Sequence, residues 1–205
     1  AVRSDGRTYL NASYARPLGP GPFPGMVLIH HLPGWDEWYR HLTHRFAYRG
    51  YVTICPDLYF RYGHGSPDDV AARVRAAGDV PDRQVVADGI GCVTFLRAQP
   101  FLNGRIGLMG TCSGGRHAYL TACSGADVQA VMAPEDLNDK YPVAPIDLTR
   151  NLPCPVLGLF GEKDRSPSPA EVAQHEEELR RHGKEYEFYT YPDAGHGFFY
   201  DDRPA

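Results

Sequence analysis

The sequence predicts an α/β fold, in which a mainly parallel β-sheet is covered by helices on both faces. Apolar runs of strand length alternate with segments of helical periodicity, and turn-forming glycines separate them. The chain has 205 residues, of which 42% are hydrophobic, enough for one substantial core but not for two. We therefore expect a single domain over residues 1–205, without internal repeats.

The first predicted unit is a strand, a helix and a second strand. Residues 26–30 and 51–55 are mainly apolar runs of strand length, as expected for strands buried in a sheet. Between them, large apolar residues recur at every fourth position over 38–46 and would share one face of a helix. Asp36 is expected near the start of this helix and Gly50 at its end. These elements form one βαβ unit.

The same alternation continues along the chain. A helix is expected over 85–96, although two glycines interrupt its apolar face, and an Asn-Gly turn then leads into a strand over 106–109. The further predicted elements are strands over 128–131, 156–160 and 185–191 and an amphipathic helix over 169–182.

Two places in this pattern lack an expected element. The chain turns abruptly after Val131, where a helical crossover is needed, and it stops nine residues after His196, where such folds usually add a closing helix. We expect either that segments are missing near Val131 and after Ala205, or that something else covers one face of the sheet.

The composition favours a small molecule as the partner. The formal net charge is −4 at pH 7, with acids and bases interspersed, so nothing favours nucleic acid or a membrane surface. No apolar run approaches about 18 residues, and residues 1–6 lack the apolar core of a signal peptide. The cysteines are odd in number, widely spaced and without a Cys-x-x-Cys pair, which suits a reducing cytoplasm: Cys55, Cys92, Cys112, Cys123 and Cys154. We expect a cytoplasmic monomer.

The most informative segment is Gly-Thr-Cys-Ser-Gly-Gly at 110–115, directly after the predicted strand 106–109. A nucleophile on a tight strand-to-helix turn is held in a strained backbone conformation, which requires small flanking residues. This turn would expose the sulfur of Cys112 at a helix N-terminus, where the helix dipole favours the thiolate. The alternative is a small buried side chain, but the flanking glycines favour a nucleophile.

An acid and a histidine follow in the order found in α/β-hydrolases. Asp164 ends Gly-Glu-Lys-Asp after the strand 156–160, and His196 comes last, within Ala-Gly-His-Gly. We therefore predict an α/β-hydrolase fold with the catalytic triad Cys112, Asp164 and His196. Asp164 could instead only cap the next helix, but the small neighbours of His196 indicate an accessible imidazole rather than a packed one.

With these motifs, the chain resembles the dienelactone hydrolase family from about residue 26 onward. The resemblance also rests on Pro-Asp-Leu-Tyr-Phe-Arg at 56–61, Gly-Arg-Ile-Gly at 104–107 and Ala-Gly-His-Gly-Phe at 194–198. It implies a compact monomer that hydrolyses a small lactone or ester through a thioester on Cys112, without cofactor or metal. The backbone N–H groups of Leu32 and Ser113 would form the oxyanion hole.

Two departures from the family pattern concern substrate binding. Where the family usually has a glutamate that holds the resting thiol, this chain has His31, so we expect Cys112 to be more ionised at rest. Of two arginines that grip the substrate carboxylate in the family, Arg61 matches one, but the other position holds Tyr200. This loss weakens the case for a charged lactone.

The predicted substrate-binding residues surround these positions. His31 is expected to line the site rather than act as a base, Arg61 either binds substrate or is solvated, and Tyr200 either packs or contacts substrate. Aromatic residues in loops after strands would form a pocket wall, where α/β sheets bind ligands. The expected set is His31, Trp35, Tyr59, Arg61 and Tyr200.

Three functions stay open on sequence grounds. The first is hydrolysis of dienelactone or a related lactone, and the second is a general carboxylesterase that prefers neutral or aromatic esters. The third is a non-catalytic binding or redox-sensing module that uses Cys112, although the retained acid and histidine count against it. A zinc site is not expected, because His41 and His44 are not part of a His-Glu-x-x-His motif.

Overall fold

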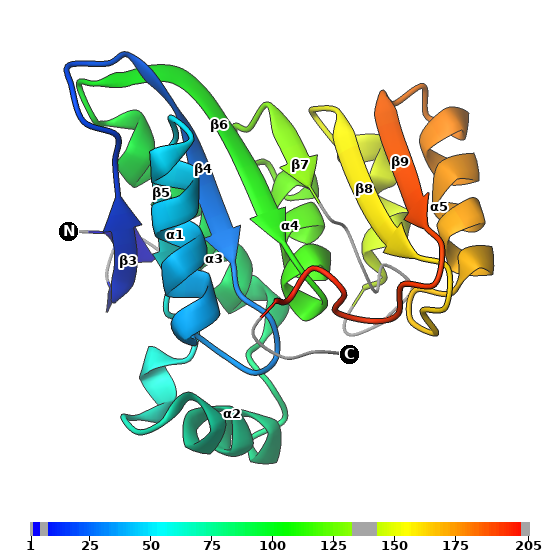
Figure 1. The fold of residues 1–205 in the computed structure, drawn as a ribbon, viewed down its shortest axis with the longest axis horizontal. Helices are drawn as coiled ribbons and strands as arrows, with labels where there is room; N and C mark the ends of the chain where they lie inside the picture. Colours follow the sequence, from blue (N-terminus) through cyan, green and yellow to red (C-terminus); the bar gives the residue numbers. More distant parts are fainter. Residues whose placement is uncertain (1, 5–7, 133–142, 202–205) are drawn as a thin grey trace.

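The computed structural model describes residues 2–4, 8–132 and 143–201. Its centre is a seven-stranded sheet in the order β3-β5-β4-β6-β7-β8-β9 (Figure 1). All neighbouring pairs are parallel except β3 with β5, which are antiparallel. The strands are β3 (Ala12–Ala15), β4 (Phe23–Ile29), β5 (Val52–Pro56), β6 (Leu102–Gly110), β7 (Ala130–Met132), β8 (Val156–Gly161) and β9 (Tyr186–Tyr191). A short hairpin of β1 (Arg3–Ser4) and β2 (Thr8–Tyr9) precedes them.

The helices lie on the two faces of the sheet, as predicted (Figure 1). They are α1 (Glu37–Tyr48), α2 (Pro67–Ala76), α3 (Asp82–Arg97), α4 (Ser113–Cys123) and α5 (Pro169–Arg181), with short 3-10 turns η1 (Phe60–Tyr62) and η2 (Pro145–Asn151). The predicted strands and helices are confirmed within a few residues. The sequence reading missed α2 and the edge strand β3. The break expected after Val131 falls on residues 133–142, outside the described residues.

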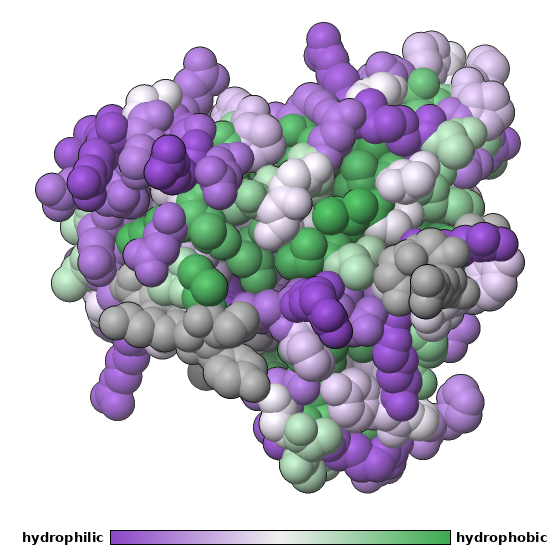
Figure 2. All heavy atoms as spheres, turned by 180° about the vertical axis from the view of Figure 1, so that it is seen from behind, coloured by the Kyte–Doolittle hydropathy of each residue, from purple (hydrophilic) through white to green (hydrophobic). Residues whose placement is uncertain are grey.

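An apolar core lies on each face of the sheet. The larger joins α3, α4 and α5 to one side of the sheet, with Val27, Ile29 and Ile54 fully buried beneath the helices. Figure 2 shows this side, where apolar residues gather across the middle and hydrophilic residues crowd around them. The smaller core packs α1 on the other side, where Trp38 and Leu42 meet Met109. The sheet is therefore buried from both sides around β4 and β6.

Helix α1 begins as its sequence predicts. Asp36 is the N-cap, and its side chain accepts a hydrogen bond from the backbone N–H of Tyr39 at 3.1 Å. The chain leaves the helix through Gly50, whose φ of +99° suits a residue without a side chain. This helix packs mainly against β5 and β3, and its start borders the segments after β4 and β6, because Asp36 bonds with His31 and Tyr39 bonds with Thr111.

The parallel strands direct several polar loops to one edge of the sheet. The segments after β4, β6, β8 and β9 leave from the carboxyl ends of their strands, which meet at this edge. Cys112 follows β6, Asp164 follows β8 and His196 follows β9. No helix among the described ranges is long and apolar enough to cross a membrane.

Candidate active site

Cys112 occupies a strained turn between β6 and α4. Its φ of 53° and ψ of −132° lie in a region that residues with side chains rarely adopt. A Cβ atom at Gly110 would lie 2.1 Å from the Gly114 carbonyl oxygen, and one at Gly114 would lie 2.2 Å from the Ile29 oxygen. The turn therefore requires both glycines because backbone meets backbone on each side of the cysteine.

The three predicted triad residues lie in one chain of contacts. The Nε2 atom of His196 is 3.2 Å from the Cys112 sulfur, and its Nδ1 atom is 3.1 Å from Asp164 Oδ2. Asp164 is held in place because its Oδ1 accepts the backbone N–H of Ser166 at 3.0 Å. The Asp164 side chain is 6% exposed and that of His196 44%, so the imidazole stands between a buried carboxylate and solvent.

The loop that carries His196 is fastened to α1 by side chains. The Tyr200 hydroxyl donates to Asp36 at 2.9 Å, and the Trp38 indole N–H donates to Asp201 at 2.6 Å. Arg45 adds an ion pair to Asp201 at 3.0 Å. We call this group, Asp36, Trp38, Arg45, Tyr200 and Asp201, the α1 tether. It connects segments more than 150 residues apart and holds the backbone next to His196.

His31 belongs to this region. Its Nε2 atom is 2.9 Å from Asp36, and its ring stacks on Trp38 and lies 5.0 Å from the ring of Tyr200. Burial alone would raise the pKa of Asp36, but hydrogen bonds from His31, the Tyr39 amide and Tyr200 bring the pKa below its usual value. The structure thus places His31 and Tyr200 together in a packed support for the loop that carries His196.

His30, next to His31, faces the other side of the strand. Its Nδ1 lies 2.9 Å from the His31 carbonyl oxygen, so Nδ1 carries the proton, and its Nε2 accepts the Leu58 N–H at 3.1 Å. Burial lowers the pKa of His30 to about 4, so the ring is neutral. The His31 carbonyl also accepts the Gly34 N–H at 3.0 Å. These two bonds fix the peptide plane that includes the Leu32 N–H.

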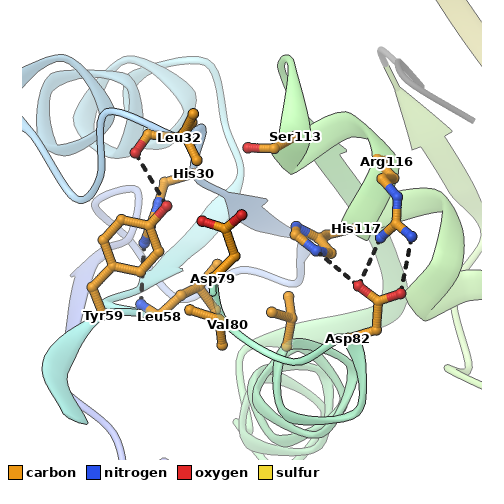
Figure 3. Close-up of a pocket in the computed structure, with 11 residues that line it drawn as sticks. His30, Leu32, Leu58, Tyr59, Asp79, Val80, Asp82, Ser113, Arg116 and His117 are labelled. Carbon is orange, nitrogen blue, oxygen red and sulfur yellow. Dashed lines mark hydrogen bonds and ion pairs between the residues drawn. The ribbon is translucent and has the colours of Figure 1, made fainter. Parts of the chain in front are cut away.

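A cavity of about 100 Å³ opens beside the turn of residues 110–114, which we call the nucleophile turn after the role that we propose for Cys112 (Figure 3). Leu32 and Ser113 line one end of it, and Tyr59 forms a wall and donates its hydroxyl to the Leu32 carbonyl at 3.1 Å. Neither the Leu32 nor the Ser113 backbone N–H donates a hydrogen bond to any described residue. We call this cavity the acyl pocket, after the role that we propose for it.

Two predicted substrate-binding residues lie away from this pocket. Arg61 forms a two-point ion pair with Asp88, at 2.9 and 3.0 Å, and the carboxylate of Asp88 is completely buried on α3. Trp35 lines a separate cavity on the other side of Tyr59, where the guanidinium of Arg40 lies over its ring. The acyl pocket therefore does not include the arginine expected to bind a carboxylate.

Several polar residues of the acyl pocket were not predicted. Asp82, at the start of α3, forms a two-point ion pair with Arg116 at 2.7 and 3.0 Å, and His117 Nε2 lies 3.3 Å from the same carboxylate. Asp79 lies in the turn before α3, and Figure 3 shows its carboxylate pointing toward Ser113. The segment Arg-His directly after the glycines of the elbow was the available signal, because position 117 falls one helical turn beyond Ser113.

The described part of the chain holds no group of three or more histidine, cysteine, aspartate or glutamate side chains placed to bind a metal ion. All five cysteines are unpaired thiols, and Cys112 is the one that is not buried. The polar groups at the sheet edge include a thiol, an imidazole and a carboxylate in contact with one another.

Similarity to known proteins identifies the family of this chain. The family model described as the dienelactone hydrolase family matches residues 10–205. The chain belongs to the dienelactone hydrolase family. This family membership makes it a carboxylic ester hydrolase, with the α/β-hydrolase fold that the sequence predicted.

Individual members of the dienelactone hydrolase family are similar over most of their length. A protein of Methylorubrum extorquens assigned as a carboxymethylenebutenolidase is 33% identical, over 93% of this chain and 68% of that protein. One from Escherichia coli K12 with the same assignment is also 33% identical, over 95% and 74%. A crystal structure assigned as a dienelactone hydrolase, from Klebsiella pneumoniae, superposes with a TM-score of 0.80 at 28% identity, over 96% of this chain and 91% of that one.

Proposed function

We propose that the protein hydrolyses a small ester or lactone by covalent catalysis, with Cys112 as nucleophile, His196 as acid and base, and Asp164 as the residue that orients His196. The single observation that carries this proposal is the continuous contact from the Cys112 sulfur through both ring nitrogens of His196 to Asp164. No described group of metal ligands and no cofactor is part of it.

In the first half of the reaction, the Cys112 thiol gives its proton to His196 Nε2, and the sulfur attacks the ester carbonyl carbon with formation of a C–S bond. The negative charge moves to the carbonyl oxygen, and the tetrahedral intermediate then collapses with cleavage of the C–O bond. The proton on His196 Nε2 passes to the departing alkoxide, leaving an acyl thioester on Cys112. Asp164 accepts the Nδ1–H of His196, which keeps Nε2 facing the sulfur at 3.2 Å.

In the second half, a water molecule gives a proton to His196 Nε2 and attacks the thioester carbonyl. The C–S bond breaks, the carboxylic acid leaves and the sulfur regains its starting form. His196 is suited to this step because it is partly exposed, so water reaches Nε2 without opening the fold. For a lactone, the alcohol and the acid released are two ends of one product.

The oxyanion is assigned to the backbone N–H groups of Leu32 and Ser113. Both are unused by described acceptors, and the Ser113 N–H belongs to the first turn of α4, where the helix dipole also favours negative charge. His30 holds the peptide of Leu32 through the His31 carbonyl. A donor aimed in this way typically lowers a barrier by roughly 3 kcal/mol.

The test compares the parent protein with Cys112→Ala and with Cys123→Ala, which removes a buried thiol far along α4. Steady-state hydrolysis is measured with dienelactone and with a neutral aryl acetate. We expect Cys112→Ala to lower kcat at least about 10³-fold on whichever ester is turned over, and Cys123→Ala to retain turnover. Mass spectrometry of acid-quenched His196→Ala should find an acyl group on Cys112. Undiminished turnover by Cys112→Ala would overturn the proposal.

A further inference from the structure

The acyl pocket has an unusual charge balance for an enzyme whose relatives are assigned to lactones with a carboxylate. Its charged lining comes from four residues on α3, α4 and the turn before α3: Asp79, Asp82, Arg116 and His117. Arg116 is 5% exposed and both its terminal nitrogens bind Asp82, so its charge is neutralised within the wall. The described lining therefore offers no free cation.

The remaining groups do not reverse this balance. His117 already lies against Asp82 at 3.3 Å, and His30 is neutral because it is buried and its Nε2 accepts the Leu58 amide. With His117 neutral, two carboxylates face one guanidinium; with His117 protonated, the charges cancel. In neither state does the described lining carry net positive charge, which a bound carboxylate would need.

Asp79 is the remaining charged residue of the pocket lining. Within the described residues, its carboxylate has no hydrogen bond or ion pair, although its backbone N–H donates to Val74 and its carbonyl accepts the Tyr62 hydroxyl. Asp79 is exposed, its φ of 66° is a left-handed conformation, and its carboxylate points toward Ser113 (Figure 3). Its charge also reaches the catalytic neighbourhood: after burial, the Asp79 charge is the next cause that raises the pKa of the pocket-wall Tyr59.

We propose that the acyl pocket selects the acyl group of the ester: it admits a short chain that donates a hydrogen bond to Asp79, from a hydroxyl or an ammonium group, and excludes a chain that ends in a carboxylate. This inference rests on the proposed function, since it assumes that the acyl group enters next to Cys112. The volume of about 100 Å³ limits that chain to a few non-hydrogen atoms. Arg61 does not counter the selection because Asp88 occupies both of its terminal nitrogens.

The first test needs no turnover. Iodoacetate and iodoacetamide alkylate the same sulfur, but the first carries a carboxylate where the second carries an amide. The ratio of their alkylation rates at Cys112 therefore measures how strongly the site disfavours a negatively charged reagent. Peptide mapping assigns the alkylated thiol. Asp79→Asn removes the charge and keeps a residue that tolerates a positive φ, and Glu177→Gln, on the exposed side of α5, is the matched loss of a carboxylate.

We expect Asp79→Asn to raise the ratio of the iodoacetate rate to the iodoacetamide rate about fivefold to tenfold, and Glu177→Gln to leave this ratio unchanged. A ratio that does not change in Asp79→Asn would overturn the proposal. An equal rise in both variants would also overturn it, because the effect would then come from the net charge of the protein.

The second test measures kcat/KM for three methyl esters of similar length: methyl butanoate, methyl 3-hydroxybutanoate and methyl hydrogen succinate. The expected order is hydroxyl, then alkyl, then carboxylate, with the penalty on the succinate reduced about tenfold in Asp79→Asn. Preference for the succinate in the parent protein would refute the selection while leaving the proposed function intact. Turnover of these esters that survives in Cys112→Ala would instead refute the proposed function, and the alkylation ratio would still decide the charge selection.

Discussion

The nucleophile turn and the loop that carries His196 hold their reactive groups by opposite means. Cys112 is fixed by the main chain, because strand β6, helix α4 and the end of β4 approach so closely that only glycine fits at 110 and 114. His196 is fixed by side chains, because the loop after β9 is joined to α1 through Tyr200 and Asp201. The first region belongs to the buried core, and the second lies at the surface.

This difference separates stability from activity within one site. A change in the nucleophile turn must disturb the sheet, since the turn shares its backbone contacts with β4. A change in the α1 tether can move His196 relative to the Cys112 sulfur while the core stays packed. The proposed mechanism makes His196 the base, and catalysis tolerates little displacement of a base. We therefore expect a change in the α1 tether to lower the rate of turnover before it lowers the free energy of unfolding.

The largest difference in stability should appear when one glycine in each region is replaced by alanine. Gly114→Ala places a Cβ 2.2 Å from the Ile29 carbonyl oxygen, where only backbone can give way, whereas Gly195→Ala in the histidine loop meets nothing within 4 Å. We expect Gly114→Ala to lower the free energy of unfolding by about 3 kcal/mol or more, or to prevent folding, and Gly195→Ala to change it by less than about 0.5 kcal/mol. Urea unfolding followed by circular dichroism measures both.

Equal losses of stability in these two variants would break the comparison. A Gly114→Ala protein that does not fold is an accepted outcome, and it is judged by its yield of soluble protein beside that of Gly195→Ala.

The second prediction concerns the pH dependence of stability that arises from His30, directly after β4. The folded state holds the pKa of His30 at about 4, below the ordinary value of 6.5, so the unfolded chain binds a proton that the folded chain does not between these pH values. The stability contribution of neutral His30 is complete above about pH 6.5 and is lost as the pH falls toward 4. We expect a loss of up to about 3 kcal/mol across this range. Chemical unfolding at several pH values measures it.

His30→Gln should reduce this dependence, because glutamine cannot take up the proton; the remaining slope is expected from His175, whose pKa burial lowers to about 3. His44→Gln, on the exposed side of α1, is the matched loss of a histidine and should keep the slope of the parent protein. Identical slopes in the parent and in His30→Gln would exclude His30 as the titrating group.

The smallest effect is expected in the α1 tether, at Tyr200. Tyr200→Phe keeps the ring against Trp38 and removes only the hydroxyl that donates to Asp36. We expect kcat to fall about fivefold through displacement of His196, with KM nearly unchanged and with at most about 1 kcal/mol of stability lost. The control is Tyr48→Phe, since Tyr48 lies on α1 but is 89% exposed. A loss of stability without a change in kcat would show that Tyr200 serves packing alone.

The sequence predicted the parts that depend on local pattern. The nucleophile turn can be predicted because its glycines, the strand before it and the helix after it are contiguous in the sequence. The order of Cys112, Asp164 and His196 along the chain follows from the order of the strands. The start of α1 at Asp36 was equally local, because an N-cap is decided by the residue and the next turn. These features need no knowledge of which distant segments meet.

The sequence could not predict the partners of its charged groups. Arg61 was expected to bind substrate or to be solvated, yet α3 places the buried carboxylate of Asp88 against it. His31 was expected to line the substrate site, and Tyr200 either to pack or to contact substrate. Their shared partner Asp36 lies 164 residues from Tyr200, so only the folded chain shows that both bind this carboxylate of the α1 tether. The pocket carboxylate of Asp79 follows α2, a helix that the apolar pattern did not indicate.

Asp36 accepts hydrogen bonds from the first turn of α1, from the end of the β4 segment and from the histidine loop. Three pieces of chain that are distant in sequence thus depend on one carboxylate. In homologues, positions 31, 36 and 200 should therefore be inherited as a set: a sequence that replaces the acid would have to replace the tyrosine and the histidine as well. Statistical covariation among these three positions in homologues would show that the support of the His196 loop has been inherited as one unit.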